Sequence, residues 1–243
     1  MAPTDQSSAP LSVSFMQEGA VFAGFEIKES LGYGAMGRVY RARDPELQAD
    51  VVLKLLRGSA LELSRNAKTV RKRFQLEARI LAQLSSPHVI KLFKTGEKDH
   101  IPYLALEYLP KAKPLNLFLE ERRLEKKPLS LQEIRLFLSQ ILQVLDEIHA
   151  RDTVHRDIKP GNLLSYEIPG KADFLSRVGI KVLDFGLAYE ESGENLTQGE
   201  ATFGTLSYMP PEAFLLSKER IYAKTDASWD IYALGVVLYE MLT

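Results

Sequence analysis

The amino-terminal third of the chain alternates short apolar segments typical of strands with one amphipathic helix, whereas the remainder has the pattern of a mainly helical region. The strand-like segments include residues 25–31, 39–42 and 50–56. With 243 residues, the chain is long enough for one domain of this mixed kind, and no internal repeat divides it. The pattern predicts an α+β fold in which a small sheet and one helix precede a mainly helical part.

A long amphipathic helix is expected from Ser130 to about Ala150. The tetrapeptide Ser-Leu-Gln-Glu at its start is a capping-box pattern. Apolar residues then recur at the spacing that buries one helix face, namely Ile134, Phe137, Leu138, Ile141, Leu142, Leu145 and Ile148. This helix provides a rigid support for the polar run His-Arg-Asp-Ile-Lys-Pro-Gly-Asn at residues 155–162.

That polar run places a carboxylate, a lysine and a side-chain amide in one loop: Asp157, Lys159 and Asn162. Moving a phosphoryl group requires a base that orients the attacking hydroxyl, a cation that neutralises phosphate charge and an oxygen that helps to hold a metal ion. The three side chains supply these groups. Taken alone, the run also fits an ordinary polar loop.

A glycine-rich segment, Leu-Gly-Tyr-Gly-Ala-Met-Gly-Arg-Val at residues 31–39, lies between two strand-like segments. Glycine has no Cβ, so the backbone can turn tightly and its N–H groups can approach phosphate oxygens closely. The spacing alone also fits a dinucleotide-binding fold or a simple hairpin turn. No helix follows it, which argues against the dinucleotide-binding fold.

The apolar strand 50–56 carries one lysine, Lys54, whose ammonium group needs a partner if it is buried. Glu77 is the candidate partner. It lies in a predicted helix whose apolar residues recur at helical spacing, namely Phe74, Ala78, Leu81 and Leu84. The alternative for Glu77 is a solvated charge on the helix surface.

The order of these motifs resembles that of the eukaryotic-type (Hanks-type) serine/threonine protein kinases. Two further motifs follow in the expected order, Asp184-Phe185-Gly186 after an apolar strand and then Pro211-Glu212. The resemblance implies a two-lobed, protein-kinase-like α+β fold. Its small N-terminal lobe would be an antiparallel sheet with one helix, and its C-terminal lobe would be mainly helical and incomplete.

The resemblance also implies a role for each catalytic residue. Asp157 would accept the proton of the attacking hydroxyl, Lys159 and Lys54 would neutralise phosphate charge, and Glu77 would hold Lys54 in place. Asn162 and Asp184 would bind Mg²⁺ through hard oxygen ligands.

An ATP site is implied by the same resemblance. Its residues would be Leu31, Gly32, Tyr33, Gly34, Ala35, Met36, Gly37, Val39, Val52, Lys54, Glu107, Leu109 and Leu164. The carbonyl of Glu107 and the N–H of Leu109 would pair with the adenine edge, with Leu106 as the gatekeeper beside it. Val52 stands where the family most often has alanine, so adenine would meet extra bulk there.

Two features favour Ser or Thr of a protein as the acceptor over Tyr. Lys159 stands two residues after Asp157, and residues 203–212 resemble the acceptor segment of serine/threonine kinases. Arg156 would receive a phosphate on the activation segment, which predicts autophosphorylation at Thr197 or Thr202. The alternative is an unregulated loop whose threonines are merely polar.

The expected organisation is a disordered leader at residues 1–18 and a kinase domain at residues 19–243. Within the domain, the N-lobe would span about 22–106, the hinge about 107–110 and a partial C-lobe 111–243. The helix 228–242 is apolar on nearly all faces, which is typical of a buried helix, so the chain is expected to be part of a longer kinase. A natural short form completed by a partner chain is the alternative. Residues 158–162 resemble the loop of bacterial members of the family slightly more than that of animal members.

Two competing functions remain open at this point. A pseudokinase or scaffold would bind nucleotide or partners without turnover, and a kinase-like enzyme would act on a small molecule. The acceptor segment 204–212 disfavours the small-molecule enzyme.

Composition restricts the partners and the location. The formal net charge of −1 gives no indication of a nucleic-acid or membrane partner. There is no cysteine, so neither disulfides nor thiolate metal sites arise. No apolar run is long enough to span a bilayer, and the leader lacks the pattern of a signal peptide, so a cytoplasmic location is expected. Residues 165–179 are longer than the corresponding connection of the family and are expected to form a surface loop.

Overall fold

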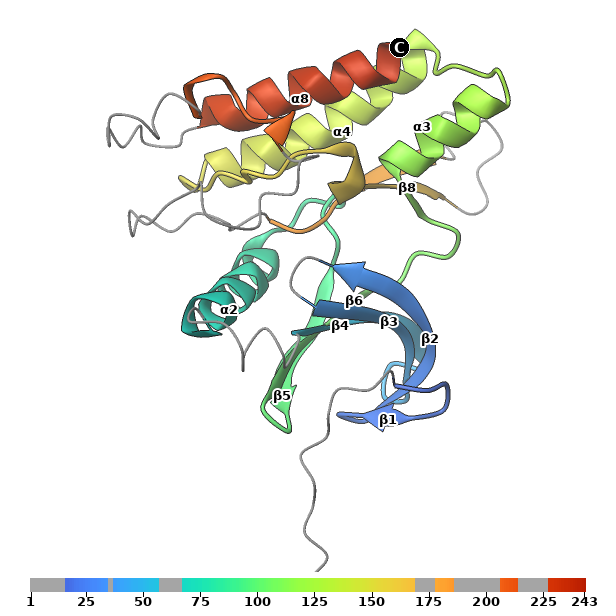
Figure 1. The fold of residues 1–243 in the computed structure, drawn as a ribbon, viewed down its shortest axis with the longest axis vertical. Coiled ribbons are helices and arrows are strands. Elements are labelled where there is room, and N and C mark those ends of the chain that lie inside the picture. Colours follow the sequence, from blue (N-terminus) through green and yellow to red (C-terminus); the bar gives the residue numbers. More distant parts are fainter. Residues whose placement is uncertain (1–15, 35–36, 57–66, 169–177, 186–205, 214–226) are drawn as a thin grey trace, which may run out of the picture. The chain divides into compact units, whose positions relative to one another are not determined.

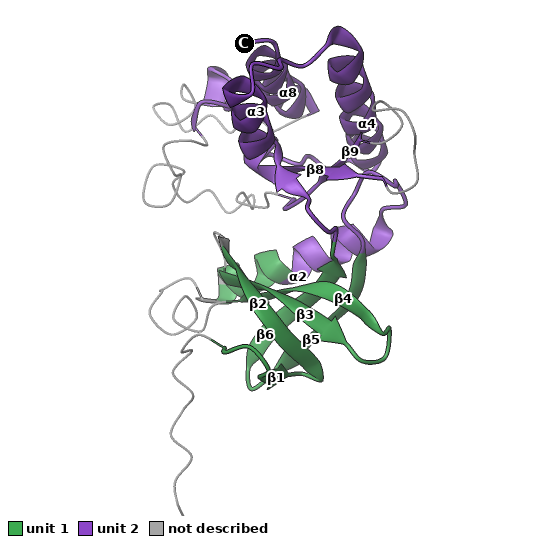
Figure 2. Cartoon of the chain, turned by 90° about the vertical axis from the view of Figure 1, so that its right-hand side faces the viewer, with its two compact units in different colours: residues 1–74, 92–108 green, residues 75–91, 109–243 purple. Residues whose placement is uncertain are grey.

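The computed structural model describes residues 16–34, 37–56, 67–168, 178–185, 206–213 and 227–243. The chain divides into two compact units (Figure 2). Unit 1 comprises Met1–Phe74 and Leu92–Tyr108, and unit 2 comprises Gln75–Lys91 and Leu109–Thr243. The predicted leader 1–18 lies almost wholly outside the described residues, apart from Met16, which packs against the core of unit 1, and the two residues after it.

Unit 1 is built on a curled antiparallel sheet of six strands in the order β1-β2-β3-β4-β6-β5 (Figure 1). The strands are β1 (Val21–Phe22), β2 (Phe25–Gly34), β3 (Gly37–Asp44), β4 (Ala49–Leu56), β5 (Leu92–Lys98) and β6 (Ile101–Glu107). They include all the strands predicted in this part of the sequence. The antiparallel sheet of the predicted N-terminal lobe is confirmed.

The two faces of this sheet carry different sets of side chains. Cross-strand partners share a face and neighbours along a strand alternate between faces. One face carries the hydrophobic core of unit 1, which includes Tyr40, Val51, Leu53, Tyr103 and Ala105. The strand register places the residues predicted to face the nucleotide on the other face, because Val39 pairs with Lys54, and Val52 pairs with Leu106.

Tyr103 organises the core face. Its ring makes edge contacts with Phe22 and Phe25 at centroid distances of 5.9 and 5.8 Å. It also covers Gly96 on the neighbouring strand, where an added Cβ would lie 2.6 Å from the tyrosine hydroxyl oxygen. The glycine is therefore required by close packing at this position.

Helix α2 (Ala67–Gln83) carries the predicted apolar face. Phe74, Ala78 and Leu81 are buried, whereas Leu84 lies just beyond the helix and is half-buried. Glu77 is also buried, at 3% exposure, so the solvated alternative for this residue is wrong. The helix passes from unit 1 to unit 2 between Phe74 and Gln75.

Unit 2 combines helices with a small sheet of order β7-β8-β9. Its further elements are β7 (Lys113–Pro114), α3 (Leu115–Leu124), α4 (Leu131–His149), the 3-10 turn η1 (Pro160–Asn162), β8 (Leu163–Glu167), β9 (Val178–Val182) and α8 (Ala227–Leu242). Helices α4 and α8 run side by side (Figure 1).

The predicted capping box of α4 is present. The Ser130 hydroxyl accepts from the Glu133 N–H at 3.2 Å, and the Glu133 carboxylate accepts from the Ser130 N–H at 2.6 Å. Arg122 adds a further contact at 2.9 Å from Glu133 and donates to the carbonyls of Lys127 and Pro128. These bonds satisfy the first N–H groups of the helix and close the connection from α3.

The prediction of a surface loop for residues 165–179 is wrong at both ends of that range. Residues Ser165 to Glu167 continue β8, and Val178 and Gly179 belong to β9. The Tyr166 ring covers Gly179, where an added Cβ would lie 2.6 Å from ring atoms. This cross-strand packing extends the paired strands β8 and β9 into the range that was predicted to be a loop.

The segment that follows α2 is joined to β9 and α4 within unit 2. Val89 forms a parallel bridge with Val182, and the buried Lys181 ammonium donates to the Val89 carbonyl at 3.2 Å. The carboxylate of Glu147 on α4 accepts from the Ser85 N–H, the Ser85 hydroxyl and the Ser86 N–H, each at 2.9 Å.

Helix α8 buries Asp230, Ala233, Leu234, Val237 and Met241. As expected for a helix that is apolar on nearly all faces, it also exposes large apolar side chains, namely Ile231, Tyr232, Tyr239 and Leu242. Among the described residues, none of the helices is both long and apolar enough to cross a membrane.

Candidate active site

The loop predicted to be catalytic brings its three functional side chains together in unit 2. Asn162 Nδ2 donates to Asp157 Oδ2 at 2.7 Å and to the Asp157 carbonyl at 2.8 Å. Lys159 Nζ lies 2.8 Å from Asp157 Oδ1. That contact is an ion pair without hydrogen-bond alignment, because Oδ1 has no hydrogen-bond partner among the described residues. The Asp157 carboxylate is thus held in place and remains 21% exposed.

The backbone of this loop is anchored to α8 by one buried carboxylate. Asp230 Oδ2 accepts from the His155 N–H and Oδ1 accepts from the Arg156 N–H, both at 2.8 Å. The His149 Nε2 atom of α4 lies 2.8 Å from Asp230 Oδ2. Arg156 has a φ of 66°, a left-handed conformation that is costly for a residue with a Cβ. The bonds to Asp230 hold the backbone in this conformation.

The imidazole of His155 is completely buried between the loop and the strand that leads to Asp184. Its Nε2 lies 3.1 Å from the Leu183 carbonyl, and its Nδ1 lies 3.3 Å from the Asp157 N–H. The ring also packs on Phe185 at a centroid distance of 4.8 Å. Both ring nitrogens are satisfied when the ring is neutral, with Nε2 donating and Nδ1 accepting.

Desolvation by this burial lowers the pKa of His155. The carboxylates of Asp230, Asp157 and Asp184 oppose the shift and do not cancel it. The hydrogen bonds also favour the neutral ring, because a proton on Nδ1 would point at the Asp157 N–H. His155 is therefore neutral in the folded protein.

The two predicted metal ligands are linked through the backbone. The Asn162 carbonyl accepts from the Leu183 N–H at 2.8 Å, next to Asp184, whose φ is 42°. Because both protons used by Asn162 Nδ2 go to Asp157, the amide oxygen is the atom left for a metal ion. An amide oxygen and a carboxylate are hard ligands of the kind that Mg²⁺ prefers alongside phosphate and water, so the residues fit this ion.

Most of the unit 1 residues that are predicted to bind the nucleotide lie on β2, β3 and β4. Gly32 has a φ of 132°, a conformation that favours glycine, and Gly34 pairs with Gly37 at the end of the β2–β3 hairpin. Lys54 is buried, at 6% exposure, and Val39 and Val52 are half-buried on the same face. Leu31 is exposed, and Tyr33 belongs to strand β2.

Some predicted residues cannot be assembled into one site. Ala35, Met36, Thr197, Thr202 and Gly186 lie outside the described residues. Lys54 and Glu107 belong to unit 1, whereas Glu77, Leu109 and Leu164 belong to unit 2. The pairing of Lys54 with Glu77 and the joint adenine site therefore stay predictions.

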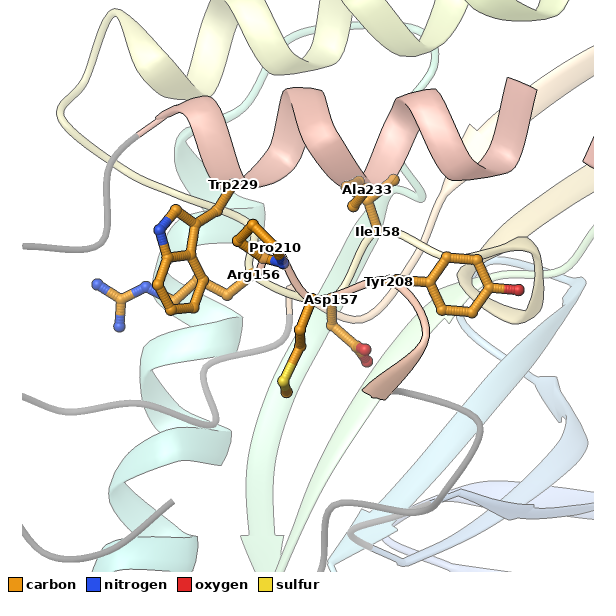
Figure 3. Close-up of a pocket in the computed structure, with 8 residues that line it drawn as sticks. Arg156, Asp157, Ile158, Tyr208, Pro210, Trp229 and Ala233 are labelled. Carbon is orange, nitrogen blue, oxygen red and sulfur yellow. The ribbon is translucent and has the colours of Figure 1, made fainter. Parts of the chain in front are cut away.

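Beside Asp157, a small hollow is lined mainly by apolar side chains (Figure 3). Its lining residues are Arg156, Asp157, Ile158, Tyr208, Met209, Pro210, Trp229 and Ala233. Tyr208 donates to Glu240 Oε1 at 2.6 Å, and burial together with this bond raises the pKa of Tyr208. The hydrogen bond ties the segment 206–213 to α8.

Sequence reasoning did not identify Asp230 as part of the site. A signal was available, because Asp230 is an acid in the first turn of a mostly apolar helix and a buried carboxylate needs donors. Its partners at residues 149, 155 and 156 lie about 75 residues away in sequence, and no local pattern indicates them.

The fold and the loop define a protein of the kinase-like class, and comparison with known proteins agrees. The model of the protein kinase domain family matches residues 25–243, so the chain belongs to this family. It is 32% identical over 225 residues to the serine/threonine-protein kinase PknB of Mycobacterium tuberculosis, a match that covers 90% of this chain and 32% of the relative. It is 33% identical over 220 residues to PrkC of Bacillus subtilis, covering 90% and 30%.

A solved structure gives the same fold. A mutant of the PknI kinase domain from Mycobacterium tuberculosis matches with a TM-score of 0.66 and 26% identity, covering 93% of this chain and 76% of that one. The resemblance to bacterial serine/threonine kinases and the kinase-like fold are thus confirmed. The chain spans about a third of the length of the curated relatives it matches.

Proposed function

We propose that this chain transfers the γ-phosphoryl group of ATP to serine or threonine hydroxyls of protein substrates. The observation that carries the proposal is the Asp157 carboxylate, which Asn162 and Lys159 fix from within a loop anchored by Asp230. This is the preorganised base that phosphoryl transfer requires. Membership of the protein kinase family supports the same reaction.

In the proposed mechanism, Asp157 orients the acceptor hydroxyl and accepts its proton as the phosphoryl group is transferred in line. Lys159 neutralises charge on the γ-phosphate, and Lys54 does so on the α- and β-phosphates, held there by Glu77. Asn162 and Asp184 would hold Mg²⁺, which supplies charge neutralisation to the phosphate oxygens. The glycine-rich loop excludes water.

ATP would bind with its adenine on the face of the unit 1 sheet that carries Val39 and Val52. The carbonyl of Glu107 and the N–H of Leu109 would pair with the adenine edge, and Leu164 would also line the adenine site. The two extra methyl groups of Val52, relative to alanine, would tighten this space.

The choice of serine or threonine as acceptor rests on Lys159 and on the relatives, several of which are named serine/threonine-protein kinases. Arg156 would bind a phosphate placed on Thr197 or Thr202 by autophosphorylation, which would order the activation segment. The proposed location is the cytoplasm, where ATP and protein substrates are available.

The test is transfer of labelled phosphate from Mg·ATP to a generic serine- and threonine-containing protein and to the chain itself. Asp157→Asn keeps the shape and removes the base, so we expect a loss of about 10²- to 10⁴-fold in rate with ATP binding retained. Asp152→Asn is the matched control. It makes the same change at an exposed position with a φ of 52°, which asparagine tolerates well.

Transfer that survives Asp157→Asn would contradict the proposed mechanism. ATP binding without any transfer by the wild type would indicate a pseudokinase or scaffold. Loss of transfer in both variants would mean that the loop had been disturbed generally.

A further inference from the structure

Arg41 lies on the nucleotide-facing side of the unit 1 sheet. In the register of the sheet, Arg41 of β3 pairs with Glu29 of β2 and with Val52 of β4. Val52 in turn pairs with Leu106 of β6. Paired residues share a face, so these four side chains form one row across the sheet, opposite the hydrophobic core.

Two carboxylates fix the orientation of the Arg41 guanidinium. Nε and Nη2 lie 2.7 and 2.6 Å from Asp50 Oδ2, and Nη1 lies 3.1 Å from Glu29 Oε1. The planar guanidinium uses both edges in these contacts, so little rotational freedom is left. Its Cζ atom then lies 4.9 Å from the centroid of the Tyr108 ring, within the range of a cation–π contact.

Tyr108 stands between the two residues that the proposed function assigns to adenine. Glu107 is the last residue of β6, and Leu109 follows Tyr108. Beyond the end of the strand, this backbone no longer has a ladder partner on β4, whose last pair with β6 is Val51 with Glu107. The contact with Arg41 therefore joins the residue after the strand to the sheet.

We propose that Arg41 is a positioning residue for the nucleotide: by stacking on Tyr108, it holds the Glu107 carbonyl and the Leu109 N–H where adenine needs them. This inference rests on the proposed function. It assigns Arg41 an effect on adenine binding and none on the chemical step, because Arg41 acts through Tyr108 and not on the phosphates.

Arg43 provides a matched control. It lies two residues further on the same strand and the same face, it is similarly exposed, and its Nη1 lies 3.5 Å from the same Asp50. The structure gives Arg43 no contact with Tyr108. Comparing the two arginines separates the stack on Tyr108 from a general loss of surface charge.

The experiment measures equilibrium binding of Mg·ATP and of inorganic tripolyphosphate with Mg²⁺ to the wild type, Arg41→Gln and Arg43→Gln. For Arg41→Gln we expect ATP binding to weaken by about twofold to fivefold, the range of one exposed cation–π contact, with tripolyphosphate binding unchanged. Arg43→Gln should bind both as the wild type does. Arg41→Lys should recover part of the ATP affinity.

Equal ATP affinity in the wild type and Arg41→Gln would overturn the inference, as would a parallel loss for ATP and tripolyphosphate. If Arg41→Gln does not fold, Tyr108→Leu tests the same stack from the other side and should reproduce the adenine-selective loss. A wild type that does not bind ATP at all would instead remove the proposed function. ATP binding without phosphoryl transfer would leave the inference on Arg41 testable by the same measurement.

Discussion

Protonation of His155 should destabilise unit 2 in mildly acidic solution. The imidazole is neutral in the folded protein because it is completely buried and because its Nδ1 accepts a hydrogen bond from the Asp157 N–H. In the unfolded chain it titrates near a pKa of about 6.5. A histidine whose folded-state pKa is lowered contributes stability that is fully present above the unfolded pKa and is lost as the pH falls.

The size of the effect follows from linkage. Because burial lowers the folded-state pKa of His155, lowering the pH from 7.5 to 5.5 protonates the imidazole more readily in the unfolded state than in the folded state. At pH 5.5 the unfolded chain has a tenfold excess of protonated over neutral imidazole, so the loss in the free energy of unfolding is at most about 1.4 kcal/mol. The average slope between these pH values corresponds to the uptake of at most about half a proton on unfolding, and the slope steepens towards the lower pH.

The assay is denaturant unfolding at a series of pH values, followed by the fluorescence of Trp229. This is the single tryptophan of the chain, and it lies on α8 in the same unit as His155. His155→Phe keeps the ring contact with Phe185 and removes the titrating group. It should lose about 1–3 kcal/mol at pH 7.5, because the Asp157 N–H loses its acceptor, but its stability should depend less on pH.

His100→Gln is the control, since the His100 side chain is 99% exposed and its replacement leaves the contacts of His155 intact. It should keep the pH dependence of the wild type. The reasoning is refuted if His155→Phe retains the full wild-type slope, or if NMR titration of the folded protein gives His155 a pKa of 6.5 or above. NMR should also report Nε2 as the protonated ring nitrogen.

Three further changes test the packing and capping of the fold. Gly96→Ala should lower the unfolding free energy of unit 1 by about 1–3 kcal/mol, measured by thermal denaturation, because its Cβ would overlap the Tyr103 ring; an unchanged midpoint would contradict this packing. Ser130→Ala should cost about 1 kcal/mol through loss of the α4 cap, whereas Ser130→Asp should restore most of it. Glu147→Gln should destabilise by about 1–3 kcal/mol at neutral pH, because its carboxylate accepts three hydrogen bonds from Ser85 and its neighbour. Desolvation opposes ionisation of Glu147, but these hydrogen bonds lower its pKa overall. The contribution of Glu147 to stability is therefore present above about pH 4.3 and is lost as the pH falls further. If Glu147→Gln has the same acid sensitivity as the wild type, Glu147 does not stabilise the fold in this way.

The sequence predicted those parts of the fold whose signals are local. The start of α4 could be predicted because Ser130 and Glu133 are three residues apart and satisfy each other's backbone N–H groups. The extension of β8 could not, because Pro169 and Gly170 indicate a turn, whereas the packing of Tyr166 on Gly179 joins residues far apart along the chain.

The same distinction applies to the candidate site. Asp157, Lys159 and Asn162 lie within six residues, so their approach could be expected from the motif. The contact of Arg41 with Tyr108 depends on the register of three strands, and no periodicity in the sequence indicates it. The pairing of Lys54 with Glu77 stays a prediction.

The dependence of the loop on Asp230 has a consequence for biosynthesis. The ribosome makes residues 155–162 about 70 residues before it makes the carboxylate that receives their N–H groups. Until α8 has left the exit tunnel, the left-handed conformation of Arg156 lacks the hydrogen bond of its N–H to Asp230. We expect a nascent chain to have a folded sheet in unit 1 well before it has an ordered loop around Asp157.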